Sequence, residues 1–223
     1  MNLLKEAMSK GRATLSEYDS KRFLSSFGIP VCREVLTENP ESAATEARKI
    51  GYPVVLKACG ADLAHKTEVG GISLNLKNLR DVRKEGHRLM KIRGCEALLV
   101  QEMVTGAREL VCGLTRDPLL GPFVMFGLGG VFTEVLDDVA FRVAPLTLGD
   151  AREMIGEIRT RKMLDPFRGE AAIDQGILGH VLVSLGRIGL EYENVAAIDI
   201  NPLKVRPDGK PVAVDALVVL RKE

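Results

Sequence analysis

Two aspartates and an asparagine near the carboxyl end of the chain have types and spacing suited to a divalent cation. Asp199 and Asn201 lie two residues apart in an apolar run, and Asp215 follows the proline-flanked pair Asp208-Gly209. An Asp-Gly turn between apolar runs predicts a hairpin, which would bring Asn201 close to Asp215. Carboxylate and amide oxygens suit Mg²⁺, which takes few protein ligands and completes its shell with phosphates and water. The residues alone are equally consistent with Asp199 and Asn201 only capping a strand end.

A lysine and a histidine in the first third of the chain have types suited to phosphate chemistry. Lys57 lies near the end of the apolar run 53–58, where a partly hydrated ammonium would favour an anion. An ion-paired or snorkelling lysine is the commoner alternative. His65 lies on a predicted turn before Gly70-Gly71, and a ring nitrogen can accept a phosphoryl group reversibly. A lone loop histidine more often faces solvent without a role.

Several further residues are compatible with nucleotide binding. Glu102 and the backbone near Val104 are suited to holding a base, and Glu109 to a ribose hydroxyl, although isolated acidic residues usually mark a solvated edge. Arg142 favours a structural ion pair over a phosphate contact. The glycines in 127–130 favour a tight turn over a phosphate cradle.

Composition excludes several classes of protein. The chain has 31 Lys and Arg against 30 Asp and Glu, so no charge excess points to nucleic acid or to an anionic membrane surface. No apolar run approaches the roughly 18 residues of a membrane span, and we expect a cytoplasmic protein. The four cysteines form no C-x-x-C pair, which argues against a structural zinc site. Neither a Walker phosphate loop nor a dinucleotide-binding glycine motif is present.

The elements that must position these residues indicate an α+β fold of two lobes, 12–103 and 104–223, with a cleft where the lobes meet. Periodicity predicts helices over 14–27, 40–50, 79–92, 150–161 and 173–190. Apolar runs predict strands over 53–58, 72–76, 97–104, 110–115, 123–126, 131–136, 141–143, 195–200 and 212–220. The second half is expected to form a mostly antiparallel sheet, and residues 105–107 a joint.

Taken in order, five segments resemble the ATP-grasp subunit of ADP-forming acetyl-CoA (acyl-CoA) synthetases and, more distantly, the nucleotide-binding subunit of succinyl-CoA synthetase. These segments are 27–31, 51–57, 65–71, 116–118 with 126–134, and 199–203. The likeness runs from about residue 14 to residue 219, and the combination is specific although each piece alone is not. The resemblance implies an ATP-grasp fold with the nucleotide in the cleft between the lobes.

The resemblance also implies a set of site residues. It assigns nucleotide contacts to Lys57 at the phosphates, Glu102 and Val104 at the adenine, and Glu109 at the ribose. It assigns Mg²⁺ to Asn201 and Asp215, with Asp199 beside them, and makes ATP or ADP the nucleotide.

By the same resemblance, the reaction converts acyl-CoA, phosphate and ADP into carboxylate, CoA and ATP through an acyl phosphate and a phosphohistidine. His65 would act as the phosphoryl relay. An α subunit with the CoA-binding domain and the primary phosphohistidine would complete the enzyme, as an α2β2 complex. The length of the chain favours the separate-subunit form over a fused polypeptide.

Two other functions are compatible with an ATP-grasp fold. A stand-alone ATP-grasp carboxylate ligase would turn over without a partner. A non-catalytic regulatory ATP-binding module would bind ATP without phosphorylation of His65. The presence of Lys57, His65, Asn201 and Asp215 argues against the regulatory module.

Overall fold

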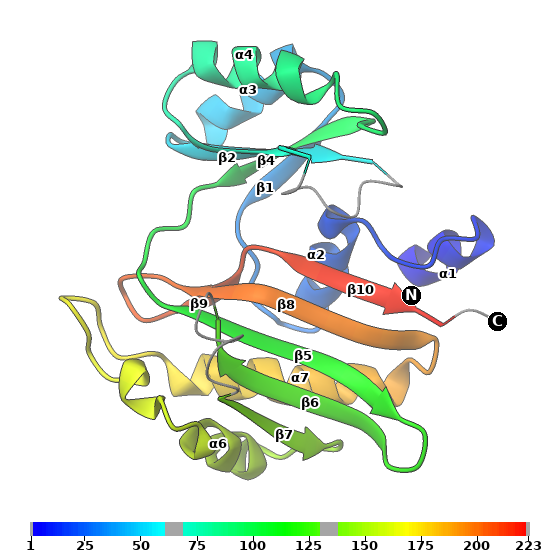
Figure 1. Cartoon of the computed structure of the whole chain (residues 1–223), viewed down its shortest axis with the longest axis vertical. Coiled ribbons are helices and arrows are strands. Elements are labelled where there is room, and N and C mark those ends of the chain that lie inside the picture. Colours follow the sequence, from blue (N-terminus) through cyan, green and yellow to red (C-terminus); the bar gives the residue numbers. More distant parts are fainter. Residues whose placement is uncertain (1, 61–68, 130–137, 222–223) are drawn as a thin grey trace. The chain divides into compact units, whose positions relative to one another are not determined.

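The computed structural model describes residues 2–60, 69–129 and 138–221, and the chain forms two compact units (Figure 1). Unit 1 comprises Met1–Val31 and Thr105–Glu223, and unit 2 comprises Cys32–Val104. The α+β class and the antiparallel sheets agree with expectation. The first 31 residues pack with the C-terminal part of the chain, whereas the expected lobe 12–103 includes most of them.

Unit 2 is a four-stranded antiparallel sheet of order β1-β4-β2-β3, with two helices on one face (Figure 1). Its elements are β1 (Glu34–Thr37), α3 (Pro40–Ile50), β2 (Val54–Cys59), β3 (Ile72–Leu76), α4 (Leu79–Leu89) and β4 (Ala97–Glu102). Asn39 caps α3 by accepting the Ser42 N–H, and Gly51 ends the helix at a φ of 99°. β1 was not expected from the sequence.

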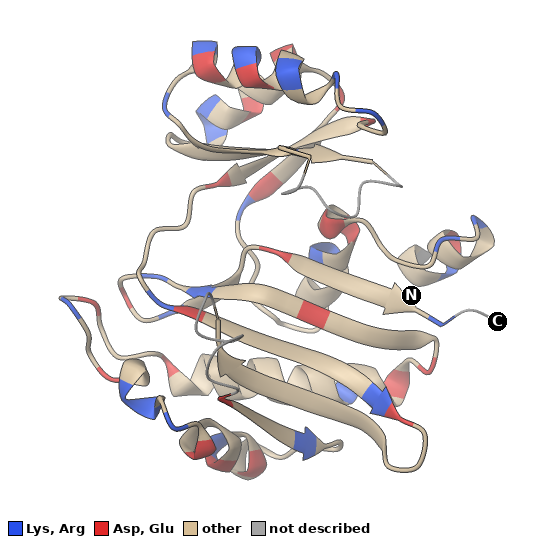
Figure 2. Ribbon diagram, viewed as in Figure 1, with Lys and Arg blue, Asp and Glu red and all other residues tan. Residues whose placement is uncertain are grey.

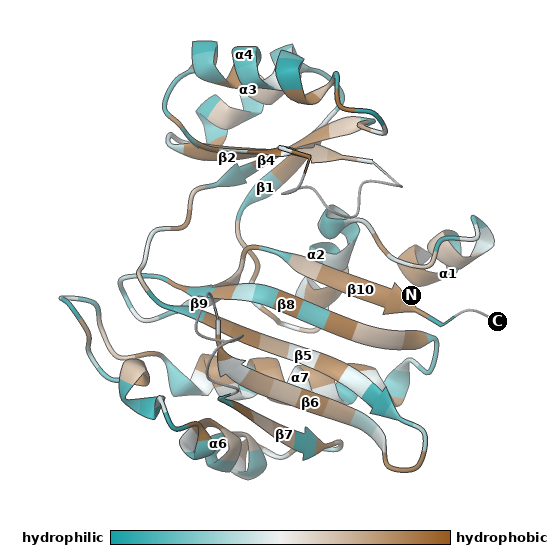
Figure 3. Cartoon of the chain, in the orientation of Figure 1, coloured by the Kyte–Doolittle hydropathy of each residue, from teal (hydrophilic) through white to brown (hydrophobic). Residues whose placement is uncertain are grey.

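The core of unit 2 lies between this sheet and its helices. Small residues of α3, namely Ala43, Ala44 and Ala47, are completely buried, so helix and sheet approach closely. Charged and hydrophilic residues are frequent on α3 and α4 (Figures 2 and 3). All six residues of β2 are buried, as predicted for a strand covered on both faces.

Unit 1 is built on a larger antiparallel sheet of order β10-β8-β5-β6-β7, with β9 also paired to β8. Its strands are β5 (Glu109–Asp117), β6 (Gly121–Leu128), β7 (Val139–Val143), β8 (Val195–Val205), β9 (Pro211–Ala213) and β10 (Ala216–Leu220). Its helices are α1 (Asn2–Ser9), α2 (Glu17–Ser25), α6 (Leu148–Glu157), the 3₁₀ turn η1 (Arg161–Leu164) and α7 (Gln175–Glu191). The expected strand 212–220 is interrupted at Val214-Asp215, and the expected strand 131–136 lies outside the described residues.

The helices of unit 1 cover one face of its sheet, where an apolar core includes Ile198 and Ile200 of β8 and Cys112 of β5 (Figure 1). Because side chains alternate along a strand, Asp199 lies on the opposite face and is exposed. The sheet therefore has one apolar, covered face and an opposite, displayed face, which carries Asp199 together with exposed apolar residues such as Leu217 of β10.

Residues before α2 cover the outer edge of β10. The Leu15 N–H donates to the Val218 carbonyl at 3.0 Å, and the Leu220 N–H donates to the Ala13 carbonyl at 2.8 Å. Thr14 forms an antiparallel bridge with Val219. The amino-terminal segment thus completes the hydrogen bonding of an edge strand. In the described part of the chain, no helix is long and apolar enough to cross a membrane.

Candidate functional site

The candidate metal-binding residues of unit 1 lie on β8, which carries Asp199 and Asn201, and immediately before the neighbouring strand β10, where Asp215 lies. Asp199 of β8 pairs with Leu217 of β10, and Ile200 pairs with Ala216, so Asp215 continues β10 towards Asn201. The Val214 N–H donates to the Pro202 carbonyl at 3.3 Å, which ties together the two chain segments that carry Asp215 and Asn201. Asp199 and Asn201 are exposed and Asp215 is half-buried.

The charges at this place favour a cation. Although Asp199 as a whole residue is exposed, burial around its carboxyl group, and then the negative charge of Asp215, raise the pKa of Asp199 above its ordinary value. A divalent cation would relieve the repulsion between these two carboxylates, and the Asn201 amide oxygen is a further hard donor. The donor set therefore fits Mg²⁺. In residues 2–60, 69–129 and 138–221, no cluster of three or more His, Cys, Asp and Glu side chains surrounds a common point, so phosphate and water oxygens would complete the shell.

Glu109 lies at the start of β5, beside Lys204 of β8. Lys204 Nζ donates to Glu109 Oε1 at 2.8 Å, and the Glu109 side chain is 35% exposed. A ribose hydroxyl would have to share this carboxylate with the lysine. While Lys204 binds Oε1, the other carboxylate oxygen, Oε2, is the atom that a ligand would contact.

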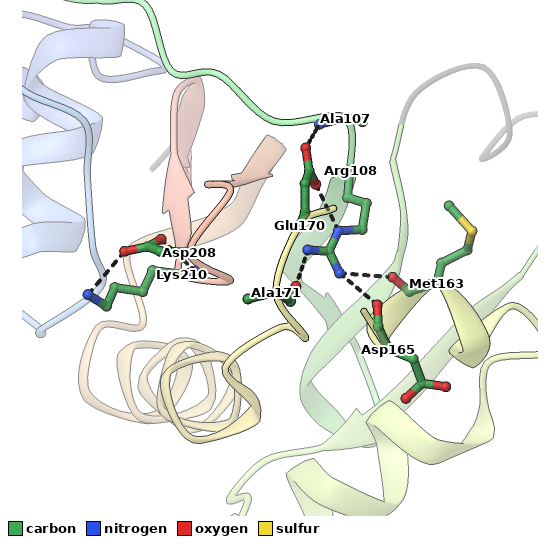
Figure 4. Close-up of polar contacts among 8 residues, drawn as sticks. All are labelled: Ala107, Arg108, Met163, Asp165, Glu170, Ala171, Asp208 and Lys210. Carbon is green, nitrogen blue, oxygen red and sulfur yellow. Dashed lines mark hydrogen bonds and ion pairs between the residues drawn. The ribbon is translucent and has the colours of Figure 1, made fainter. Parts of the chain in front are cut away.

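A buried arginine fixes the chain immediately before Glu109 (Figure 4). Arg108 Nε lies 3.2 Å from Glu170 Oε2, and its side chain is 1% exposed. Its other nitrogens donate to the carbonyls of Met163, at 3.4 Å, Asp165, at 3.0 Å, and Ala171. The contacts hold the start of β5 against the loop that follows η1.

The same carboxylate also holds the residue before Arg108. Glu170 Oε1 accepts the Ala107 N–H at 2.8 Å. At Gly106, with a φ of 134°, a Cβ atom would lie 1.9 Å from the Val205 carbonyl oxygen, so only glycine fits there. In the adjoining β8–β9 turn, Lys210 pairs with Asp208 at 3.1 Å (Figure 4). Arg108 was not identified from the sequence, because its partners lie 55 to 63 residues later and form no local pattern.

In unit 2, Lys57 lies within a regular ladder. It pairs with Leu99 of β4 on one side and Ile72 of β3 on the other, and the residue is 5% exposed. Hydrogen bonds on both sides of β2 therefore fix the backbone that carries this ammonium group.

The end of β4 provides the other candidate groups of unit 2. Glu102 Oε1 accepts the Arg33 N–H at 2.8 Å, and the Glu102 N–H donates to the Arg33 carbonyl at 2.9 Å. The carboxylate of Glu102 thus organises the chain beside it. Val104 is buried, and among the described residues its backbone N–H and carbonyl have no hydrogen-bond partner. His65 lies outside the described residues.

Two open alternatives from the sequence are decided by the structure. Arg142 pairs with Glu157 through Nη1, at 2.9 Å, and Nη2, so the ion pair is confirmed. The expected tight turn at 127–130 is wrong at its start, because Gly127 belongs to β6. A Cβ atom there would lie 2.8 Å from the Asp138 carbonyl oxygen, so close packing of β7 explains this glycine.

Comparison with protein families and curated proteins gives consistent matches. The ATP-grasp domain family matches residues 6–220. The β subunit of acetate–CoA ligase [ADP-forming] I from Pyrococcus furiosus is 37% identical over 98% of this chain and 96% of its own length. Acetate–CoA ligase [ADP-forming] I from Archaeoglobus fulgidus is 41% identical over 90% of this chain, which spans 30% of that longer protein.

Solved structures agree with these matches. The dinucleotide-forming acetyl-coenzyme A synthetase 1 of Ca. Korarchaeum cryptofilum, with coenzyme A, Ca-AMPCP and HgCl⁺, superposes with a TM-score of 0.93 and 43% identity over 99% of both chains. A second structure of that protein holds coenzyme A and Mg-AMPPCP, with a phosphohistidine segment pointing towards the nucleotide-binding site. Its TM-score is 0.87 and its identity 44%, again over 99% of both chains.

Proposed function

Since the chain belongs to the ATP-grasp family and, within it, to the β subunits of ADP-forming acetate–CoA ligases, we propose that it transfers a phosphoryl group to ADP in acyl-CoA cleavage. The overall reaction is acyl-CoA, phosphate and ADP giving carboxylate, CoA and ATP. The observation that carries the proposal is the grouping of Asp199, Asn201 and Asp215 on the displayed face of the unit 1 sheet. This grouping supplies oxygen donors where a nucleotide-bound cation is needed.

Asn201 and Asp215, with Asp199 beside them, are the proposed Mg²⁺ ligands. Burial, and then the negative charge of Asp215, raise the pKa of Asp199, and the repulsion between the two carboxylates favours a bound cation over an empty pair. Bound Mg²⁺ would offset negative charge on the nucleotide phosphates and on the phosphoryl group in transfer. The chain's own part is to hold these oxygens at fixed positions, on β8 for Asp199 and Asn201 and in the short segment between β9 and β10 for Asp215.

Four residues are proposed to bind the nucleotide. Lys57 contacts the phosphates, and the low exposure of its strand strengthens that attraction because little water competes. Val104 binds the base through its backbone N–H and carbonyl. Glu102 fixes the neighbouring backbone by accepting the Arg33 N–H. Glu109 takes a ribose hydroxyl with the carboxylate it shares with Lys204.

His65 is the proposed phosphoryl carrier. When it is phosphorylated, an oxygen of the ADP β-phosphate attacks the phosphorus, the P–N bond breaks, and the imidazole keeps the electron pair as ATP forms. In the preceding step, the same nitrogen attacks the phosphorus of the phosphohistidine on the α subunit, the P–N bond of that phosphohistidine breaks, and its imidazole keeps the electron pair. The imidazole is suited to both steps because its charge state changes near neutral pH.

The second part of the enzyme is proposed to be an α subunit that holds the CoA-binding domain and the primary phosphohistidine, in an α2β2 assembly. The relative from Pyrococcus furiosus is itself named a β subunit, which supports a separate partner. The longer relative from Archaeoglobus fulgidus is compatible with the same two parts in one polypeptide.

The test is ATP formation from acetyl-CoA, phosphate and ADP, with and without the α subunit purified from the same source. We expect turnover only with both parts, and we expect His65→Ala to bind Mg·ADP normally but form no ATP. His87→Ala, which changes an exposed histidine on α4, is the matched control and should keep full activity. Turnover by this chain alone would instead support a stand-alone ligase, and ATP binding without phosphorylation of His65 would support a regulatory module.

A further inference from the structure

Helix α2 carries a buried ion pair to which the proposed mechanism assigns no role. Lys21 Nζ lies 2.7 Å from Glu17 Oε1, one helical turn away, and the two side chains are 0% and 4% exposed. Removing two opposite charges from water is unfavourable, and an apolar pair of similar volume is often as stable. Stability alone is therefore a weak explanation for this pair.

Lys21 is directed at the backbone beside a proposed Mg²⁺ ligand. Its Nζ donates to the Val214 carbonyl oxygen at 3.3 Å, across 193 residues of sequence. Val214 lies between β9 and β10, immediately before Asp215. The Val214 N–H donates to Pro202, the residue after Asn201. A single residue thus connects the ammonium of Lys21 with both segments that carry proposed ligands.

Neighbouring contacts make the position of α2 relative to β10 well defined (Figure 1). Ser20, next to Lys21, accepts the Val218 N–H on its Oγ at 3.1 Å. Beyond the end of α2, the Pro30 carbonyl accepts the Ala213 N–H at 2.9 Å. Both ends of the segment 213–218 are therefore bound to the region of α2, and Lys21 contacts the interruption between its two strands.

We propose that Lys21, held by Glu17, is a positioning residue for the Mg²⁺ site. By fixing the Val214 carbonyl, the ammonium sets the plane of the Val214–Asp215 peptide and therefore the direction of the Asp215 carboxylate. Because Lys21 is fully buried, it acts through this backbone and not by touching the nucleotide. The inference rests on the proposed function, since it takes Asp215 to be a ligand.

The test compares the Mg²⁺ dependence of ADP binding in the full chain, by calorimetry at several fixed Mg²⁺ concentrations. The double variant Glu17→Gln/Lys21→Met removes the charges while keeping similar shapes. We expect the Mg²⁺ concentration for half-maximal ADP binding to rise roughly 10-fold or more, the usual effect of losing a group that orients a metal ligand. ADP binding in EDTA should not change. Lys21→Arg, which keeps a buried cation and its donors, should restore most of the Mg²⁺ response.

The matched control is Ser184→Ala, which removes a hydrogen bond to the Phe27 carbonyl behind α2 without touching the segment 213–218. It should keep the wild-type Mg²⁺ midpoint even if its melting temperature falls. Glu17→Gln alone is a milder variant with an expected shift in the same direction. If either Glu17→Gln/Lys21→Met or Glu17→Gln folds and keeps the wild-type Mg²⁺ midpoint, the inference is overturned and the proposed function stands. Absence of Mg²⁺-dependent ADP binding in the wild-type chain would overturn both.

Discussion

Lys57 in unit 2 and Asp215 in unit 1 are held by different kinds of contact. Lys57 lies in the middle of a strand that is paired on both sides, so its position follows from the regular ladder. Asp215 lies between β9 and β10, where pairing is interrupted, and side chains such as Lys21 bind the backbone next to it. Glu109 is likewise preceded by Arg108, which binds three carbonyls.

The difference shows what each arrangement depends on. A group on a regular ladder keeps its position when neighbouring side chains change, because main-chain hydrogen bonds carry it. A group at an interruption depends on a few buried polar side chains. Substitutions in unit 1 should therefore disturb the backbone around the candidate residues, whereas substitutions in unit 2 should remove a chemical group and leave the fold intact.

The largest effect is expected at Arg108. Arg108→Met would leave Glu170 without its cation and three backbone carbonyls without their donor. We expect a loss of about 3–5 kcal/mol in the free energy of unfolding. Urea denaturation measures this loss. Arg33→Met removes an exposed guanidinium 3.5 Å from the buried Glu102 carboxylate, which keeps its hydrogen bond from the Arg33 N–H, so stability should change little. Equal losses in the two variants would contradict the comparison.

Asp215→Asn should affect catalysis next most strongly. Loss of a ligand carboxylate beside Asp199 should lower the rate of ATP formation about 100-fold or more at ordinary Mg²⁺ concentrations. Steady-state assays with the α subunit, repeated over a range of Mg²⁺, measure the effect. Asp208→Asn, in the exposed β8–β9 turn, is the control. If added Mg²⁺ makes no difference to either variant, Asp215 is not a ligand.

Lys57→Met should separate function from folding in unit 2. The methionine keeps most of the volume of the side chain but lacks the ammonium, so we expect ADP to bind roughly 10- to 100-fold more weakly. Because the β2 ladder is unchanged, the unfolding midpoint should stay near that of the wild type. Nucleotide titration and thermal denaturation of the same sample test both statements. A variant that binds ADP normally would remove Lys57 from the proposed site.

The smallest expected effect concerns acid stability in unit 1. Burial by itself would raise the pKa of Asp138, but hydrogen bonds from Thr160 and from the Arg159 N–H outweigh it and the pKa lies below its ordinary value. The folded-state value is thus below that of the unfolded chain. Asp138 therefore contributes stability above about pH 4, and the contribution disappears as the pH falls through the folded-state value.

Asp138→Asn measures this contribution. The difference in unfolding free energy between the variant and the wild type should be constant from about pH 5 to 7 and should shrink below about pH 4. Asp117→Asn, at an exposed hairpin where the N–H groups of Leu120 and Leu119 also lower the pKa of the carboxyl group, should show a smaller effect of the same sign. A difference that grows on acidification would contradict the assignment.

Much of the fold follows from local pattern. Asn39, Pro40 and Gly51 delimit a helix because capping depends on residues within a few positions. The Asp208-Gly209 turn forms as predicted, with Gly209 at a φ of 86°. The short strand β1 was missed, since four residues beginning with a glutamate show no clear alternation.

The candidate residues themselves were identified from residue type and from resemblance, but their supports were not. Glu17 and Lys21 have the i, i+4 spacing of an ordinary surface pair, and only tertiary packing buries them. Arg108 binds backbone carbonyls, which carry no sequence identity. Side chains that orient a site through the main chain are therefore the part that sequence reasoning does not reach.

The cover that residues Ala13–Leu15 provide for β10 has a consequence for solubility. A bare strand at the margin of a sheet offers unpaired N–H and carbonyl groups to any other chain, and such strands seed aggregation. Here the backbone bonds from Leu15 and Ala13 occupy these groups in β10. Shortening the chain from its amino terminus past Leu15 would uncover them, so self-association would set in before catalytic function could be judged.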